Sequence, residues 1–203
     1  MLFGIGATTL AFIPIRNALI TEGATDILLL PTMFREAARA SCLGFRVAPG
    51  LAKANKLQIA IVDTESPRTA YLTDGDQAGG ALKRQIMSAG VSEERIFALP
   101  QLGGAKSTIE DFVLSESLLK AVNLELERSH GKGHQMEPSD LIRPGAVNSI
   151  ETWCAARKIK AAKNRAIAYH LLEYRHENPL VADEARQELI DLLRRVVTVF
   201  EKT

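Results

Sequence analysis

The feature that most constrains the fold is a regular alternation of short apolar segments with segments of helical periodicity in the N-terminal half. Apolar runs typical of buried strands occupy 18–21, 45–48, 70–73 and 95–99. Helical spacing marks 25–40 and 77–89, while 51–63 fits either a strand or a helix and is assigned as a crossover helix from its place between strands. Parallel strands need such crossovers. The alternation therefore predicts an α/β fold with a parallel sheet flanked by helices.

The second half of the sequence has a different pattern. After the glycine-containing loop 102–106, helical segments at 115–128, 159–176 and 182–200 surround a polar stretch at 129–145. A chain of 203 residues is long enough for one filled core and a smaller appended unit. We therefore expect an α/β catalytic domain over 1–128 and a small helical domain over 129–203.

The composition argues against a disordered, disulfide-rich, zinc-binding or membrane-spanning protein, but it does not indicate a binding partner. With 46% hydrophobic and 24% charged residues and a net charge of +1, extensive disorder is not expected. Cys42 and Cys154 lie far apart without metal-ligand spacing, which favours a reducing cytoplasm over a disulfide framework or a zinc site. The apolar stretch 1–15 is interrupted by glycine and proline and is too short for a membrane helix, so no membrane association is expected. Its apolar character suggests packing against an upstream domain.

Acidic residues follow two of the predicted strands. Glu22 comes directly after the first strand and Asp26 one helical turn later, a pair that the helix dipole alone would explain. Asp74 and Asp76 follow the third strand, and the carboxyl ends of parallel strands meet at one edge of a sheet. Converging carboxylates repel one another unless a divalent ion, which prefers oxygen ligands, balances them. The four side chains therefore predict a metal site.

The sequence around these residues resembles a known family. Glu22 and the Asp74-x-Asp76 motif resemble the Toprim domain, and the segments EGATDILLLPTMFREA, AYLTDGDQAGG, GVSEERIFAL and TIEDFV resemble the C-terminal nuclease region of the overcoming-lysogenization-defect (OLD) family. The resemblance is clear over 20–123 and looser in the helical tail. It implies metal-dependent cutting of DNA with two Mg²⁺ or Mn²⁺ ions about 3.5–4 Å apart.

The resemblance also implies residue roles. The implied metal ligands are Glu22, Asp26, Asp74, Asp76 and Glu110, of which Glu22, Asp74 and Asp76 are also counted as catalytic. Asp111 is the weaker candidate because adjacent side chains diverge. Lys163 matches the lysine that the family uses near its metals, with Lys160 as the alternative, and this lysine would balance charge that develops on the phosphate.

The helical tail contains a run of cations. We call 157–165 the basic segment, and its cations are Arg157, Lys158, Lys160, Lys163 and Arg165. Such a run alone is typical of a solvated surface, whereas the resemblance favours contact with the DNA backbone. Trp153 and Tyr169 are able to stack on bases, but their spacing with apolar neighbours favours core positions.

Three functions compete at this level. The first is the OLD-type endonuclease, with DNA and an upstream ATPase domain as its expected partners. Whether the chain also forms a homodimer is left open by the sequence. This chain has no Gly-x-x-x-x-Gly-Lys-Ser/Thr loop, so ATP hydrolysis by these residues is not expected. The second is an Asp-x-Asp phosphohydrolase, disfavoured because the motif follows the third strand while Glu22 follows the first. The third is a non-catalytic docking module, suggested by the apolar stretch 1–15.

Overall fold

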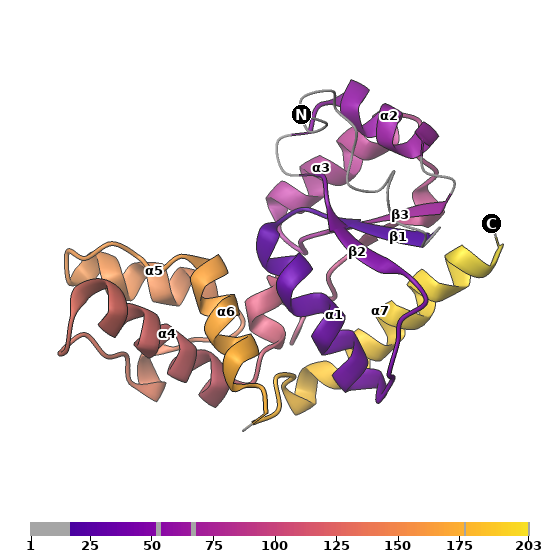
Figure 1. Cartoon of the computed structure of the whole chain (residues 1–203). Helices are drawn as coiled ribbons and strands as arrows, with labels where there is room; N and C mark the ends of the chain where they lie inside the picture. The colour runs from indigo at the N-terminus through magenta and orange to yellow at the C-terminus, as the bar shows by residue number, and fades with distance from the viewer. Residues whose placement is uncertain (1–16, 52–53, 66–67, 177, 203) are drawn as a thin grey trace, which may run out of the picture.

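A four-stranded parallel sheet forms the middle layer of the α/β part of the protein (Figure 1). The computed structural model describes residues 17–51, 54–65, 68–176 and 178–202. The strands are β1 (Asn17–Thr21), β2 (Arg46–Pro49), β3 (Arg68–Thr73) and β4 (Ile96–Ala98). They lie in the order β2-β1-β3-β4, and each neighbouring pair is parallel. The predicted α/β class is confirmed, and a parallel sheet with flanking helices is consistent with a Toprim-type fold.

Seven α-helices accompany the strands in the described part of the chain. They are α1 (Ala24–Ala38), α2 (Lys56–Glu65), α3 (Gln77–Ser88), α4 (Ser115–His130), α5 (Ala146–Ala156), α6 (Asn164–Tyr174) and α7 (Asp183–Lys202). Short 3-10 turns are η3 (Glu93–Arg95), η4 (Ile109–Phe112) and η5 (Pro138–Asp140). The helical assignment of the ambiguous segment 51–63 is confirmed for its second part, because α2 begins at Lys56.

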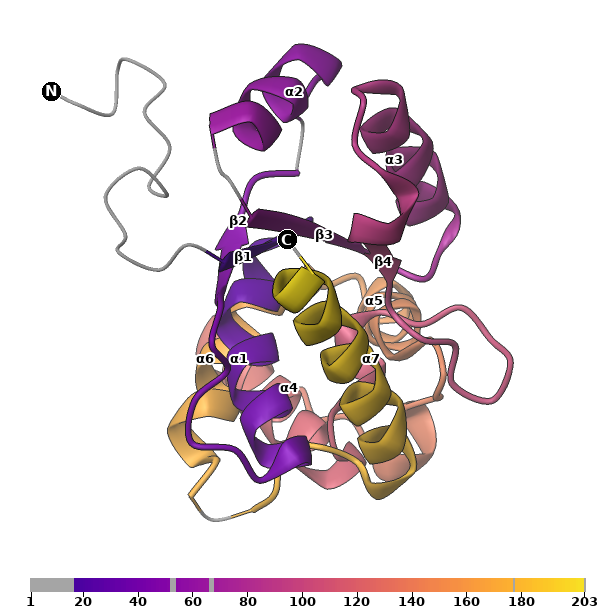
Figure 2. The same cartoon turned by 90° about the vertical axis from the view of Figure 1, so that its right-hand side faces the viewer.

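Helices cover both faces of the sheet because side chains alternate along each strand. Leu19 of β1 packs into the larger core, which includes residues of α1 and α7. Its neighbour Ile20 packs on the opposite face with Ile59 of α2 and Ile86 of α3. Figure 2 shows α2 and α3 on one side of the sheet and α1 and α7 on the other. The result is a three-layer arrangement.

The remaining helices pack beside this layered part. α4, α5 and α6 lie to one side of the sheet in Figure 1, and α6 contacts both α4 and α1. α7 then returns to contact α1 and β3. One hydrophobic core includes Leu19 of β1, Leu126 of α4 and Leu171 of α6, so the two parts share their interior. The domain boundary after residue 128 stays a prediction.

The end of α5 differs from the predicted course of the chain. The helix expected over 159–176 begins only at Asn164. Lys158 adopts a left-handed conformation with φ of 56°, and the N–H groups of Lys158 and Ile159 bond back to the carbonyls of Ala155 and Cys154. This is a Schellman arrangement, which ends a helix. Residues 158–163 therefore cross between α5 and α6 outside a helix.

Nowhere in the described ranges does a helix have both the length and the apolar character needed to cross a membrane.

Candidate metal centre and basic segment

Glu22 and Asp26 lie where β1 passes into α1. Asp26 is 7% exposed, and its Oδ2 accepts a hydrogen bond from the Gly23 N–H at 2.8 Å. Glu22 follows β1 directly, and its Oε2 is buried without a hydrogen-bond partner in the described structure. A buried carboxylate oxygen without a donor is costly unless a cation or a proton meets it. The Glu22 carboxylate is therefore able to accept a cation or a proton at Oε2.

Asp74 and Asp76 lie where β3 passes into α3. Asp76 is the N-cap of α3, and its Oδ1 accepts a hydrogen bond from the Gly79 N–H at 2.8 Å. A Cβ at Gly79 would lie 2.1 Å from the Asp74 carbonyl oxygen, and one at Gly75 would lie 2.9 Å from the Leu99 carbonyl oxygen. Both glycines thus allow backbone approaches that a side chain would prevent. The tight turn holds the two aspartates beside the start of α3.

The other predicted ligands lie close enough to Asp74 to raise its pKa. Burial raises the pKa of Asp74 to about 8, and further increases come from negative charges on the other four predicted ligands. In decreasing order of effect these are Asp26, Glu22, Glu110 and Asp76. Charges raise a pKa in this way only when they lie close together. We call these five side chains the acidic cluster.

Three other members of the acidic cluster also have raised pKa values. Burial raises the pKa of Asp26 to about 6, opposed by the Gly23 N–H and assisted by the charge of Glu22. Burial raises the pKa of Glu110 to about 7, with the charge of Asp26 adding to the effect. The pKa of Glu22 is raised as well, mainly by burial. Without a cation, Asp74 therefore keeps its proton at neutral pH, and Glu110 is about half protonated.

Glu110 and Asp111 have different environments in η4. Glu110 is 4% exposed and belongs to a turn that contacts both α1 and α5. Asp111 uses Oδ1 to accept from the N–H groups of Gly145 and Ala146 at 2.8 and 2.9 Å, and Oδ2 to accept from the Thr108 N–H at 2.9 Å. Asp111 is thus occupied in holding the start of α5 against η4. Glu110 remains the candidate ligand of the two.

The carboxylates are near one another but are not arranged as ligands of one ion. Among the residues that the structure describes, no group of three His, Cys, Asp or Glu side chains could hold a metal ion as positioned. The donor set still fits Mg²⁺ or Mn²⁺, because it consists of hard carboxylate oxygens and includes the unpartnered Glu22 Oε2. A bound ion would have to draw the side chains together. Metal ligation by the acidic cluster stays a prediction.

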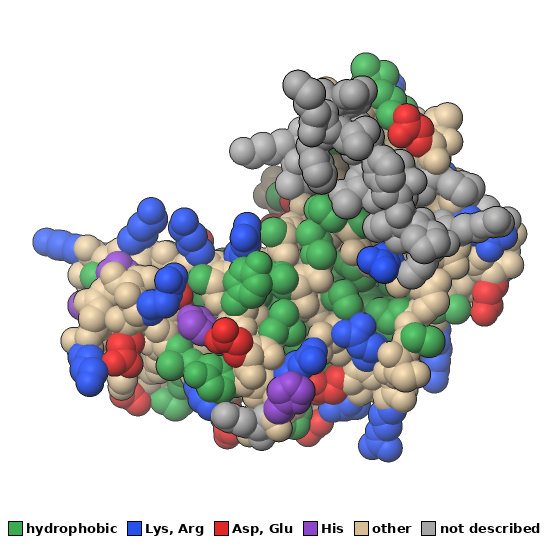
Figure 3. Space-filling model, in the orientation of Figure 1, with side chains coloured by type: hydrophobic (Ala, Val, Ile, Leu, Met, Phe, Trp, Pro, Cys, Tyr) green, Lys and Arg blue, Asp and Glu red, His purple; other side chains and the backbone are tan. Residues whose placement is uncertain are grey.

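The basic segment lies at the surface, where the Arg157 guanidinium also stacks on the Trp153 ring at 3.8 Å. All five of its cations are exposed, and within the described ranges none of them forms an ion pair with a carboxylate. Figure 3 shows Lys and Arg side chains in a row over α5 and the start of α6, which flank this segment. Lys163 is the N-cap of α6, and α6 contacts α1, the helix that carries Asp26. Contact between Lys163 and the acidic cluster stays a prediction.

The two aromatic residues of this region differ in burial. Trp153 is 6% exposed, and its Nε1–H donates to Asp140 Oδ2 at 3.0 Å, so its predicted core position is confirmed. The core prediction for Tyr169 is wrong, because this side chain is 47% exposed. α6 buries Ile167 and Leu171 instead, and Tyr169 lies on another face of the helix. Helical spacing alone did not specify which face of α6 meets its neighbours.

Sequence reasoning also missed a buried polar network between α4 and α6. Glu125 is 3% exposed and accepts hydrogen bonds from Arg128 and Ser129, and His170 Nε2 lies 3.2 Å away. The Arg128 guanidinium, opposed by burial, holds the pKa of Glu125 at about 2. The spacing of Glu125, Arg128 and Ser129 on one helix was the available signal. Nothing in the sequence indicated that His170 would join them.

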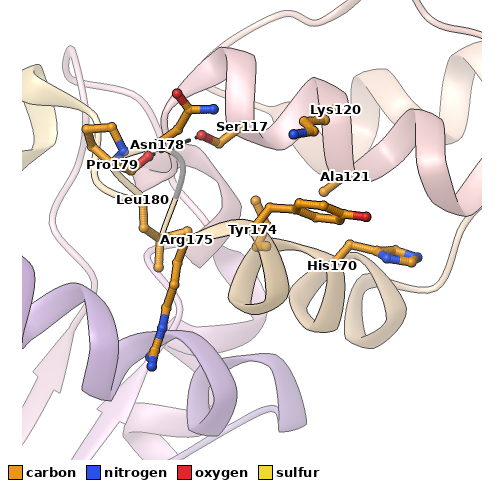
Figure 4. A pocket seen from close by; sticks show the side chains of 10 residues that line it. Ser117, Lys120, Ala121, His170, Tyr174, Arg175, Asn178, Pro179 and Leu180 are labelled. Atoms are coloured by element: carbon orange, nitrogen blue, oxygen red, sulfur yellow. Dashed lines mark hydrogen bonds between the residues drawn. The ribbon is translucent and has the colours of Figure 1, made fainter.

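A small cavity next to this network is too small for a substrate. Its walls come from α4, α6 and the segment before α7, and they include Ser117, His170 and Tyr174 (Figure 4). Ser117 Oγ donates to the Pro179 carbonyl at 3.1 Å across it. The space is about 10 Å³, room for about one water. Catalysis is not expected there.

Comparison with known proteins identifies the architecture. No protein-family model and no curated protein matches the chain. The C-terminal region of the Burkholderia pseudomallei OLD protein is similar in structure, with a TM-score of 0.57 and 15% identity over 92% of this chain and 100% of that chain. The C-terminal region of the Xanthomonas campestris pv. campestris OLD protein gives a TM-score of 0.56 and 13% identity over 92% of this chain and 97% of that chain. The chain therefore has the fold of OLD C-terminal regions.

Proposed function

We propose that this chain is a metal-dependent DNA endonuclease module of the OLD type. The observation that carries the proposal is the position of Asp74 at the end of β3, where burial and the charges of the other acidic-cluster members raise its pKa to about 8. Such a site gains stability by exchanging protons for a divalent cation. The similarity to OLD C-terminal regions supports the same proposal. An upstream ATPase domain remains an expectation from the sequence resemblance.

Each part of the site has a role in this proposal. The acidic cluster would hold two Mg²⁺ or Mn²⁺ ions, which would supply stabilisation of the attacking and leaving oxygens of the cleaved phosphodiester. Lys163 balances negative charge on the phosphate. Arg157, Lys158, Lys160 and Arg165 bind neighbouring phosphates and fix the position of the strand.

A plasmid assay tests the proposal. Supercoiled DNA is incubated with the purified chain and Mg²⁺ or Mn²⁺, and nicked and linear products are measured. We expect Asp74→Asn to lose about 100-fold or more in nicking rate, since it removes a carboxylate from the centre of the acidic cluster. Asp191→Asn is the matched control, because Asp191 is exposed on α7 and pairs only with nearby surface residues. Equal nicking by wild type and Asp74→Asn would mean that a contaminant cuts the DNA.

The non-catalytic docking module is the second candidate. It is favoured by the absence, in the described part of the chain, of three acidic side chains already arranged for one ion. Calorimetric titration with Mn²⁺ separates the two functions. Binding that is lost in Asp74→Asn supports the nuclease, whereas no binding by wild type supports docking. The Asp-x-Asp phosphohydrolase would require turnover of a small phosphate ester that Asp74→Asn abolishes.

A further inference from the structure

An exposed aromatic ring lies directly after the basic segment. Tyr169 is 47% exposed on α6, and the Arg165 guanidinium lies 5.7 Å from the centre of its ring. We propose that Tyr169 and Arg165 form a platform on which an unpaired nucleobase stacks, so that the module prefers single-stranded or locally opened DNA to intact duplex. The inference rests on the DNA binding of the proposed function and adds the class of DNA that is bound.

The packing of α6 leaves the Tyr169 ring available. α6 buries Ile167, Ala168 and Leu171 in the hydrophobic core. Tyr169 is turned away from this buried stripe and remains about half exposed. A flat ring with an adjacent guanidinium offers both a π surface and a cation, the combination used by proteins that bind single strands. The Tyr169 ring is therefore not part of the hydrophobic core and is available to contact a ligand.

The charges around Tyr169 favour a nucleic acid as the occupant. Arg157, Lys158, Lys160, Lys163 and Arg165 precede it without an intervening acidic residue. Within the described ranges none of these cations is paired with a carboxylate. An acidic residue, Glu173, follows one helical turn after Tyr169. This order predicts that the phosphate backbone follows the basic segment and that a base reaches Tyr169 near the end of the path.

Base pairing determines which DNA fits this platform. In a duplex each base is stacked between its neighbours, so its face is not free to contact a protein ring. An unpaired base exposes that face, and stacking on an aromatic side chain is largely independent of base identity. Tyr169 should therefore strengthen binding to single strands without imposing a sequence preference.

Binding in EDTA tests the inference without cleavage. The probes are a labelled single-stranded oligonucleotide and the duplex of the same sequence, and affinities are measured by fluorescence anisotropy at fixed salt. We expect Tyr169→Ala to weaken single-strand binding by about 5- to 150-fold, which corresponds to about 1–3 kcal/mol for one stacked base. Duplex affinity should change less than about twofold, and Tyr169→Trp should restore the single-strand affinity.

A matched variant and a direct readout complete the test. Tyr174→Ala removes the other exposed tyrosine of α6, which lines the small cavity instead, and should leave both affinities unchanged. An oligonucleotide containing 2-aminopurine should be quenched on binding wild type but not Tyr169→Ala. If Tyr169→Ala binds single strands like wild type, or loses both substrates equally, the platform is refuted while DNA binding stands. If wild type binds neither probe, the proposed function fails as well.

Discussion

Two neighbouring glycines at the start of α3 should respond to alanine in opposite directions. A Cβ at Gly79 would lie 2.1 Å from the Asp74 carbonyl oxygen and 2.8 Å from its carbonyl carbon. A Cβ at Gly80 would meet no atom within 4 Å. Gly79 also donates its N–H to Asp76 at 2.8 Å. The clash at Gly79 is with backbone, so it cannot be relieved by rotation of a side chain.

These contacts set the size of the two effects. Gly80→Ala should stabilise the protein by about 0.5–1 kcal/mol, because alanine is the better helix former. Gly79→Ala gains the same helical preference, but steric overpacking costs about 1–3 kcal/mol or more and strains the capping hydrogen bond of about 1 kcal/mol. We therefore expect Gly79→Ala to be less stable than Gly80→Ala by about 2–4 kcal/mol.

Urea denaturation followed by far-ultraviolet circular dichroism measures this difference. The midpoint should rise for Gly80→Ala and fall for Gly79→Ala, with similar slopes for both variants. Gly79→Ala should also lower Mg²⁺-dependent nicking, because relief of the clash moves Asp74. A midpoint for Gly79→Ala equal to or above that of Gly80→Ala would refute the close approach of α3 to the Asp74 turn.

Three further predictions concern buried acids and helix ends. Asp111→Ala should destabilise the protein by about 1–3 kcal/mol in urea, because the buried Ala146 N–H and the partly buried Gly145 N–H at the start of α5 lose their acceptor. Burial and neighbouring charges raise the pKa of Asp74 to about 8 in the folded protein, whereas the unfolded chain releases this proton near pH 4. In EDTA the free energy of unfolding should therefore fall between pH 5 and pH 9, and Mg²⁺ should reduce this fall. A rise over the same range in EDTA would contradict the raised pKa. Glycine should raise the free energy of unfolding by about 0.5–1 kcal/mol in both Lys158→Gly and Arg39→Gly, because each residue has a left-handed φ. Only Lys158→Gly should weaken DNA binding. Equal affinities of the two variants would show that Lys158 does not contact DNA.

Much of the fold followed from local sequence patterns. The apolar runs predicted all four strands of the described sheet. The reason is clearest for β1 and β3, since a strand buried on both faces needs a nearly continuous apolar segment. The crossover requirement correctly predicted a helix between β2 and β3 where periodicity alone was ambiguous, although the helix begins at Lys56 and not at residue 51. The gathering of Glu22 and Asp74 at one sheet edge followed from the same topology, since parallel strands end together.

Features that depend on tertiary contacts did not follow from the sequence. The break after α5 depends on a left-handed Lys158, where glycine would have been the usual signal. The exposure of Tyr169 depends on the rotation of α6 against its neighbours, which periodicity does not fix. Asp111 binds the start of α5 across a long stretch of chain, so its structural role appeared only with the fold.

Anomalous diffraction from crystals of the chain soaked in Mn²⁺ is the most direct measurement of metal binding at the strand ends. We expect one or two peaks among Glu22, Asp74 and Asp76, with carboxylate oxygens about 2.0–2.6 Å away and paired peaks about 3.5–4 Å apart. Asp74→Asn crystals should lose these peaks. Well-diffracting wild-type crystals with Mn²⁺ bound elsewhere and no peak beside Asp74 would contradict the metal centre and, with it, the proposed nuclease.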